Sequence, residues 1–125
     1  MIYRGNPEKG IIMLVDWERV NSVMMADEDD KEWFNEMMDT LKDNMKTRLE
    51  NISKHVQDKD QEPLRKELHQ VKGMSANFGL AEINKISATG EAYAKTGKVD
   101  EAIAEAVKLP DLWDKTLKEL NAKLG

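Results

Sequence analysis

Apolar residues recur every three or four positions along most of this 125-residue chain, the spacing that places them on one side of an α-helix. The longest stripe spans about six helical turns. A second stripe begins after Pro63, which suits the first turn of a helix, and ends before Gly79, which suits a C-terminal cap. The pattern predicts two long amphipathic helices. Their apolar positions are Phe34, Met38, Leu41, Met45, Leu49, Ile52 and Val56 in the first, and Leu64, Leu68, Val71, Ser75 and Phe78 in the second.

The chain before the first long helix is predicted to contain one short helix. Residues 1–12 carry two glycines and one proline and show no periodicity, so we expect an irregular tail. Residues 15–24 have rough helical spacing, and Asp16 is of a type that caps helix N-termini. The acidic run at 26–32 suits the start of the long helix, because carboxylates stabilise the positive end of the helix dipole.

The chain after Gly79 is also predicted to be helical. Residues 81–96 form an amphipathic segment that Gly97 closes, and a further helix is expected with Asp100 as its N-cap. Pro110 either kinks one long C-terminal helix or separates two short ones. No strand is predicted, and the connections are short. We therefore expect an all-α fold, an antiparallel up-down four-helix bundle with a short additional N-terminal helix, over residues 13–125.

Composition narrows the possible functions. The net charge is −5, which argues against nucleic acid as the main partner, because neutralising phosphates needs a basic surface. The absence of cysteine excludes disulfides and thiolate chemistry and suits a reducing cytoplasm. No apolar run reaches about 18 residues, so no membrane insertion is expected. Two histidines form no recognisable metal cluster, and the acidic run lacks the alternating ligands and central glycine of a calcium loop.

One of the two histidines, His69, falls on the outer side of the second long helix. With Leu64 at zero and about 100° per residue, the apolar positions of this helix lie within about 40° of zero. His69 then lies near about 140° and Gly73 near about 180°. Glycine inside a helix costs about 1 kcal/mol relative to alanine. Its outward angle weakens the alternative that it lets a neighbouring helix pack closely.

Small and cationic residues surround this histidine. Ala76 lies on the same side of the helix, and Arg65, Lys66 and Lys72 are cations on an otherwise acidic chain. An exposed imidazole is largely neutral near pH 7 and is then a nucleophile. A nearby ammonium group stabilises a phosphoryl group, and phosphoryl transfer requires mainly positioning and charge compensation. Each feature has an ordinary explanation as solvated surface. Their placement on one face favours a site for phosphoryl transfer.

The stretch "HQVKGMSANFGL" resembles the signature of histidine-containing phosphotransfer (HPt) domains: a histidine, two residues, Lys-Gly, a small pair, a hydrophobic residue and glycine. The resemblance covers about residues 14–124, and Glu91 also stands at a matching place. Gly90 stands where the family usually has leucine, so we expect that helix to be weakened or bent. The residues that match the signature are His69, Lys72, Gly73, Ser75, Ala76, Asn77, Phe78 and Gly79.

The resemblance implies a phosphorelay function. His69 would accept a phosphoryl group through Nε2 and exchange it with the aspartate of a response-regulator receiver domain. Lys72 would offset the phosphate charge, and Gly73 would leave room for the receiver. The implied partners are receiver domains and a hybrid sensor histidine kinase, with the chain acting as a monomer in the cytoplasm without a cofactor or metal of its own. The residues expected to contact partners are Arg65, Lys66, Gln70, Ala76 and Asn77.

Two other functions stay open. The first is a non-catalytic helical module that docks receivers, although the intact His69, Lys72 and Gly73 set argues against it. The second is the phosphoacceptor domain of a larger chemotaxis-type kinase, but no glycine-rich phosphate loop is present to bind ATP. The other histidine, His55, lies beside the apolar stripe of its helix, and we interpret it as structural.

Overall fold

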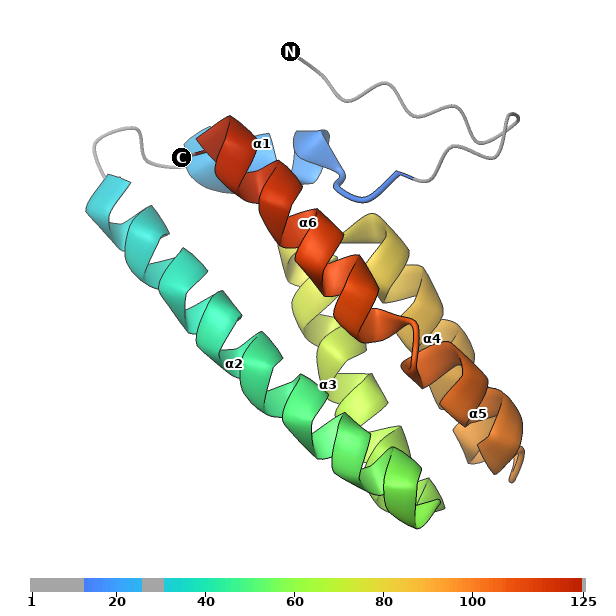
Figure 1. Cartoon of the computed structure of the whole chain (residues 1–125). Coiled ribbons are helices and arrows are strands. Elements are labelled where there is room, and N and C mark those ends of the chain that lie inside the picture. The colour runs from blue at the N-terminus through green and yellow to red at the C-terminus, as the bar shows by residue number, and fades with distance from the viewer. Residues whose placement is uncertain (1–12, 26–30, 125) are drawn as a thin grey trace.

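The computed structural model describes residues 13–25 and 31–124, and every regular element in these residues is a helix (Figure 1). The predicted tail, 1–12, and most of the acidic run lie outside the described residues, as does the side chain of Phe34. No helix in the described part of the chain is long and apolar enough to cross a membrane. The elements are α1 (Trp17–Met25), α2 (Lys31–Asp58), α3 (Gln61–Phe78), α4 (Ala81–Lys95), α5 (Val99–Ala106) and α6 (Leu109–Leu124).

Helices α2 and α3 follow the predicted apolar stripes. Among the α2 positions, four are buried and two are partly buried against the core, while on α3 the apolar side packs inward in the same way. Helix α3 packs along both α2 and α4, and α4 packs in turn against α5 and α6, so α3 and α4 form the centre of the bundle (Figure 1). The buried stripe residues are Met38, Leu41, Met45, Ile52, Leu64, Leu68, Val71 and Ser75.

The turns that join these helices use left-handed backbone. Gly79 ends α3 with a φ of 70°, as predicted, and the N–H of Leu80 donates to Ser75 O at 2.8 Å. Gly97, with a φ of 79°, lies between α4 and α5. Lys59, between α2 and α3, has a φ of 50° although it is not a glycine. These short turns reverse the chain between neighbouring long helices.

The short helix α1 is tied to the end of α3. Asp16 caps it as predicted, since its Oδ1 accepts the N–H of Arg19 at 3.3 Å. The backbone N–H of Asp16 donates to Gly79 O at 2.6 Å, and the Arg19 side chain donates to Asn77 O at 3.1 Å. A Cβ on Gly79 would lie 2.8 Å from Asp16 O, so this close approach also requires glycine. Trp17 is buried and joins α1 to α6, where its Nε1–H donates to Glu119.

The C-terminal segment resolves one open alternative and corrects one prediction. Pro110 lies in the first turn of α6 and therefore separates α5 from α6 instead of kinking one helix. The prediction that Asp100 is the N-cap of α5 is wrong. Lys98 occupies that position, because the turn at Gly97 is tight and α5 begins at once with Val99. Asp100 lies in the first turn instead.

Gly90 does not interrupt α4, which runs unbroken from Ala81 to Lys95. The glycine is buried, and a Cβ built on it would lie 3.1 Å from Leu68 Cδ1 and 3.4 Å from Glu105 Cβ. The glycine therefore does not break the helix. The missing side chain lets α3 and α5 approach α4 closely.

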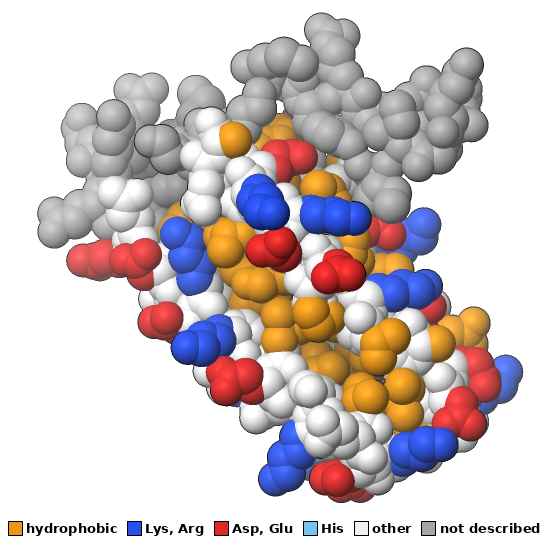
Figure 2. Space-filling view, in the orientation of Figure 1, with side chains coloured by type: hydrophobic (Ala, Val, Ile, Leu, Met, Phe, Trp, Pro, Cys, Tyr) orange, Lys and Arg blue, Asp and Glu red, His pale blue; other side chains and the backbone are white. Residues whose placement is uncertain are grey.

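One face of the bundle carries a shallow apolar groove of about 200 Å³ between α2 and the α5–α6 segment. The apolar side chains are visible in Figure 2 as a band bordered by charged residues, and no histidine shows on this face. The groove and His69 are therefore separate features of the surface. The residues that line the groove are Leu49, Ile52, Ser53, Val56, Ala106, Val107 and Pro110.

Candidate functional site

His69 lies near the middle of α3 and faces outward, as its position on the helix predicts. The neighbouring core residues Leu68 and Val71 are completely buried, whereas the His69 side chain is 57% exposed. The helix is therefore anchored on one side and displays the imidazole on the other. An imidazole on a packed helix is held in place more firmly than one on a loop.

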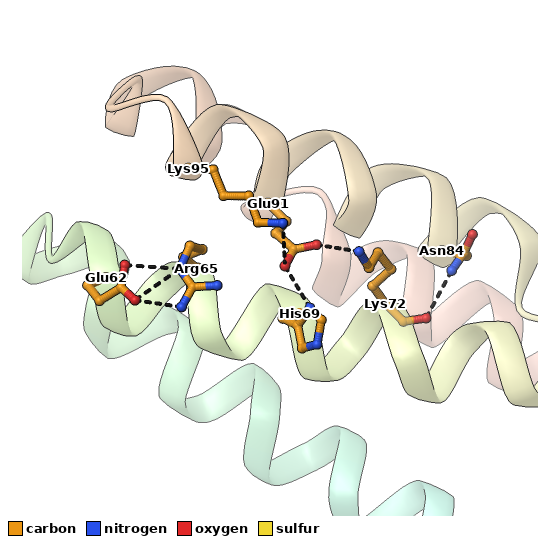
Figure 3. Close-up of polar contacts among 7 residues, drawn as sticks. All are labelled: Glu62, Arg65, His69, Lys72, Asn84, Glu91 and Lys95. Carbon is orange, nitrogen blue, oxygen red and sulfur yellow. Dashed lines mark hydrogen bonds and ion pairs between the residues drawn. The ribbon is translucent and has the colours of Figure 1, made fainter.

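A buried carboxylate from α4 binds the inner nitrogen of this imidazole. Glu91 is only 3% exposed, and its Oε2 lies 2.7 Å from His69 Nδ1 (Figure 3). An ionised carboxylate only accepts hydrogen bonds, so Nδ1 carries the proton and donates a hydrogen bond to Glu91. In the neutral ring, Nε2 then holds the free lone pair, and Figure 3 shows this nitrogen turned away from Glu91.

The surroundings of Glu91 keep it ionised. Burial by itself would raise the pKa of its carboxyl group, because a charged group loses hydration. The hydrogen bonds from Lys72 and His69 outweigh this effect, so the pKa of Glu91 lies below its ordinary value of 4.5. At neutral pH the carboxylate is therefore charged and can fix the tautomer of His69.

Lys72 is paired with Glu91 in this structure. Its Nζ lies 2.5 Å from Glu91 Oε1, while Lys95 Nζ lies 3.8 Å from the other oxygen, Oε2. The two lysines and His69 thus surround one carboxylate, with α3 supplying Lys72 and α4 supplying Lys95 (Figure 3). The cation predicted to serve a phosphate is therefore engaged with a carboxylate.

The contact role of Glu91 was not predicted from the sequence, where this residue only matched a family position. A signal was present, because Glu91 lies beside Ser87 and Ala94 on the buried side of α4. A buried carboxylate requires a cation or hydrogen-bond donors. Its partners, however, lie on another helix. Asn84 was also missed, and its Nδ2 donates to Lys72 O at 2.9 Å, which fixes α4 against the same turn of α3.

Gly73 lies one turn after His69 and is exposed, as predicted. A Cβ placed on it would meet no atom within 4 Å. Close packing inside the chain therefore does not explain this glycine, in contrast to Gly90. The surface beside the imidazole is open.

The residues predicted to contact partners are exposed around His69, with one exception. Lys66, Gln70, Ala76 and Asn77 are all exposed. Arg65 is half-buried and pairs with Glu62, its Nη2 lying 2.5 Å from Glu62 Oε1. This hydrogen bond lowers the pKa of Glu62 and raises that of Arg65. Arg65 is thus partly neutralised by its own helix.

Two further predictions concern His55 and metal binding. His55 is on α2 and half-buried, beside the apolar stripe as expected. Within the described ranges, no three histidine, aspartate, glutamate or cysteine side chains are placed to hold a metal ion together.

The protein is a helical bundle that presents an exposed imidazole to its surroundings. A carboxylate from the next helix holds this imidazole in place. Comparison with protein families is in agreement, since the family model for the Hpt domain matches residues 36–123, more than half of the chain. The chain belongs to the Hpt domain family, whose domains carry out histidine phosphotransfer in phosphorelay signalling. No curated protein and no solved structure matches the chain significantly.

Proposed function

We propose that the chain is a phosphohistidine carrier in which His69 exchanges a phosphoryl group with the aspartate of a response-regulator receiver domain. The observation that carries this proposal is the contact of His69 Nδ1 with Glu91 Oε2, at 2.7 Å, on a side chain that is 57% exposed. In the neutral ring this contact leaves Nε2 without a proton, on a side chain that is open to solvent. The proposed domain spans residues 13–125, with α2, α3, α4 and α6 as an antiparallel up-down four-helix bundle and α1 as the additional helix.

The proposed transfer requires no proton to leave the site. The Nε2 lone pair of His69 attacks phosphorus, and the bond from phosphorus to the receiver's aspartate oxygen breaks. The electron pair of that bond leaves on the carboxylate. The ring becomes an imidazolium that keeps its Nδ1 proton, and the negative charge of Glu91 stabilises it. Return of the group to a receiver follows the same path in reverse.

The other residues of the surface have supporting roles in this proposal. Lys72 turns from Glu91 toward the phosphoryl oxygens, since an ammonium forms charge-assisted hydrogen bonds with them. Gly73, with open space around it, admits the edge of the receiver's active site. The surface that contacts the partner includes Lys66, Gln70, Ala76 and Asn77, with Arg65 at its margin.

The proposed partners are receiver domains and a hybrid sensor histidine kinase, and the proposed setting is the cytoplasm. The cations around His69 suit a receiver, whose phosphorylated aspartate is anionic and whose metal ion belongs to the receiver. The chain is proposed to act as a monomer without a cofactor of its own. The direction of transfer depends on the relative stability of phosphohistidine and phosphoaspartate in each pair.

A labelled-phosphate experiment tests this function. The protein is incubated with a receiver carrying radioactive aspartyl phosphate, and label on the chain is measured after acid and base treatment. We expect acid-labile, base-stable label on the unaltered protein and on His55→Gln, and none on His69→Gln. Label on His69→Gln would show that the assigned site is wrong. If the unaltered protein binds the receiver but takes up no label, the chain is a non-catalytic docking module.

A further inference from the structure

Glu91 lies within ion-pair distance of two lysines. Only one of them is needed to balance the negative charge of Glu91 while His69 is unphosphorylated. Lys72 Nζ is 2.5 Å from Oε1, and Lys95 Nζ is 3.8 Å from Oε2. The Lys95 side chain is 55% exposed and comes from the next turn of α4, four residues after Glu91. Lys95 is close enough to tighten its contact by a small side-chain rotation.

Phosphorylation changes the charges that Lys72 must serve. At rest the carboxylate of Glu91 and the ammonium of Lys72 balance each other. A phosphoryl group on His69 adds about two negative charges, and the imidazolium adds one positive charge. Lys72 then lies between two anions. If it turns to the phosphoryl group, Glu91 loses its nearest cation while only 3% of its side chain is exposed, and an uncompensated buried carboxylate is costly.

We propose that Lys95 is a reserve cation, which keeps Glu91 charge-balanced when Lys72 turns to the phosphoryl group on His69. This inference rests on the proposed function. Lys95 is a positioning residue, because it acts through Glu91 and does not itself contact the reacting atoms. It keeps the carboxylate ionised, and the carboxylate keeps the Nδ1 proton in place throughout the transfer.

The reserve role predicts that the two lysines substitute for each other. The carboxyl titration of Glu91 is followed by ¹³C NMR in the unphosphorylated protein. We expect Lys95→Met alone to change its midpoint only slightly. Lys72→Met should raise the titration midpoint moderately. The double variant should raise it by about one pH unit more than the sum of the single changes, because the buried carboxylate then keeps only the hydrogen bond from His69 and has lost both neighbouring ammonium groups. If adding Lys95→Met to Lys72→Met moves the midpoint no further, Lys95 is an ordinary solvated charge and the inference fails.

A second measurement follows the phosphorylated state. The protein is mixed with a phosphorylated receiver, and the fraction of label on the chain is measured at equilibrium. Lys95→Met should reduce this fraction by about three- to tenfold, whereas Lys95→Arg should largely preserve it. Lys85→Met is the control, since it removes the same charge from an exposed position of α4 that makes no contact with Glu91. Equal losses in Lys95→Met and Lys85→Met would overturn the inference. The proposed function would still stand, because it fails only if the unaltered protein takes no label or if His69→Gln does.

Discussion

At the scale of single residues, Glu91 gives the two nitrogens of His69 different properties. Its Oε2 lies 2.7 Å from Nδ1 and accepts a hydrogen bond from the Nδ1–H, so the neutral ring carries its free lone pair on Nε2. A mere surface histidine would sample both tautomers. In the proposed transfer, the buried carboxylate thus orients an exposed imidazole so that Nε2 is the nucleophile.

The charge of Glu91 makes the stability of the fold depend on pH. The pKa of this carboxyl is lower in the folded chain than its ordinary value of 4.5, so its ionisation stabilises the fold above about pH 4.5. That stabilisation is lost as the pH falls through the lower, folded pKa. We predict that Glu91→Gln is less stable than the unaltered protein by about 1–2 kcal/mol at pH 7. The difference should shrink in acid, which urea unfolding at pH 7 and pH 3 measures. An equal difference at both values would contradict this account.

The same substitution separates two effects of Glu91 on the site. Glutamine retains an oxygen that accepts a hydrogen bond from Nδ1–H, but it has no negative charge to stabilise an imidazolium. We predict that Glu91→Gln is still labelled by a phosphorylated receiver, with a transfer rate lowered by about ten- to a hundredfold. Single-turnover transfer measures the rate, and Lys85→Met is an unrelated control on α4. An unchanged rate would mean that the charge of Glu91 does not assist the reaction.

At the scale of elements, two glycines in the middle of helices serve opposite purposes. Gly73 on α3 has open space around its Cβ position, whereas Gly90 on α4 has Leu68 Cδ1 at 3.1 Å. We predict that Gly73→Leu stabilises the fold by up to about 1 kcal/mol, because leucine has the higher helix propensity. The same change at Gly90 should destabilise it by about 1–3 kcal/mol through overpacking. Thermal unfolding of both variants measures the difference, and equal signs would contradict it.

The Gly73 variant also tests access to His69. A leucine side chain one turn from the imidazole would occupy the space that the proposed function assigns to the receiver. We predict that Gly73→Leu transfers phosphate at least about tenfold more slowly while its helix content is unchanged. Gly73→Ala is the matched control with a smaller side chain and should be affected less. A stable Gly73→Leu protein with unaltered transfer would show that this surface is not approached.

The turn between α2 and α3 offers a simple stability test. Lys59 has a φ of 50°, in the region where a non-glycine residue is strained by about 1 kcal/mol. Its ion pair with Asp100 at 3.4 Å is exposed and contributes little. We predict that Lys59→Gly stabilises the fold by about 0.5–1 kcal/mol. Lys59→Ala removes the ion pair but keeps the backbone strain, so it should not stabilise the fold. Equal effects of the two substitutions on urea unfolding would contradict the strain argument.

Elements whose signal is local were predictable from the sequence. The stripe of α2, the outward direction of His69 and the cap at Gly79 each depend on residues within a few turns of one another. The Asp100 cap was wrong, because the start of α5 depends on the turn geometry at Gly97. The contact between His69 and Glu91 was not predicted, because it depends on the register of two packed helices. The close packing at Gly90 was not predictable for the same reason, since only the fold shows what surrounds this glycine.

At the scale of the whole molecule, the bundle places a local excess of cations on an acidic protein. The chain carries a net charge of −5, yet Arg65, Lys66, Lys72 and Lys95 lie near His69, against Glu62 and Glu91. The apolar groove between α2 and the α5–α6 segment is a separate feature. The packed centre formed by α3 and α4 carries the imidazole, both lysines and the carboxylate, so the site depends mainly on that pair of helices.

In the proposed function, the fold makes Nε2 of His69 the atom that accepts the phosphoryl group. The most direct measurement is NMR of the protein labelled with ¹⁵N in histidine and phosphorylated by a receiver, in which the coupling of ³¹P to ¹⁵N identifies the bonded nitrogen. We expect coupling to Nε2 of His69, with Nδ1 still carrying its proton. Phosphorus bonded to Nδ1, or to either nitrogen of His55, would contradict it.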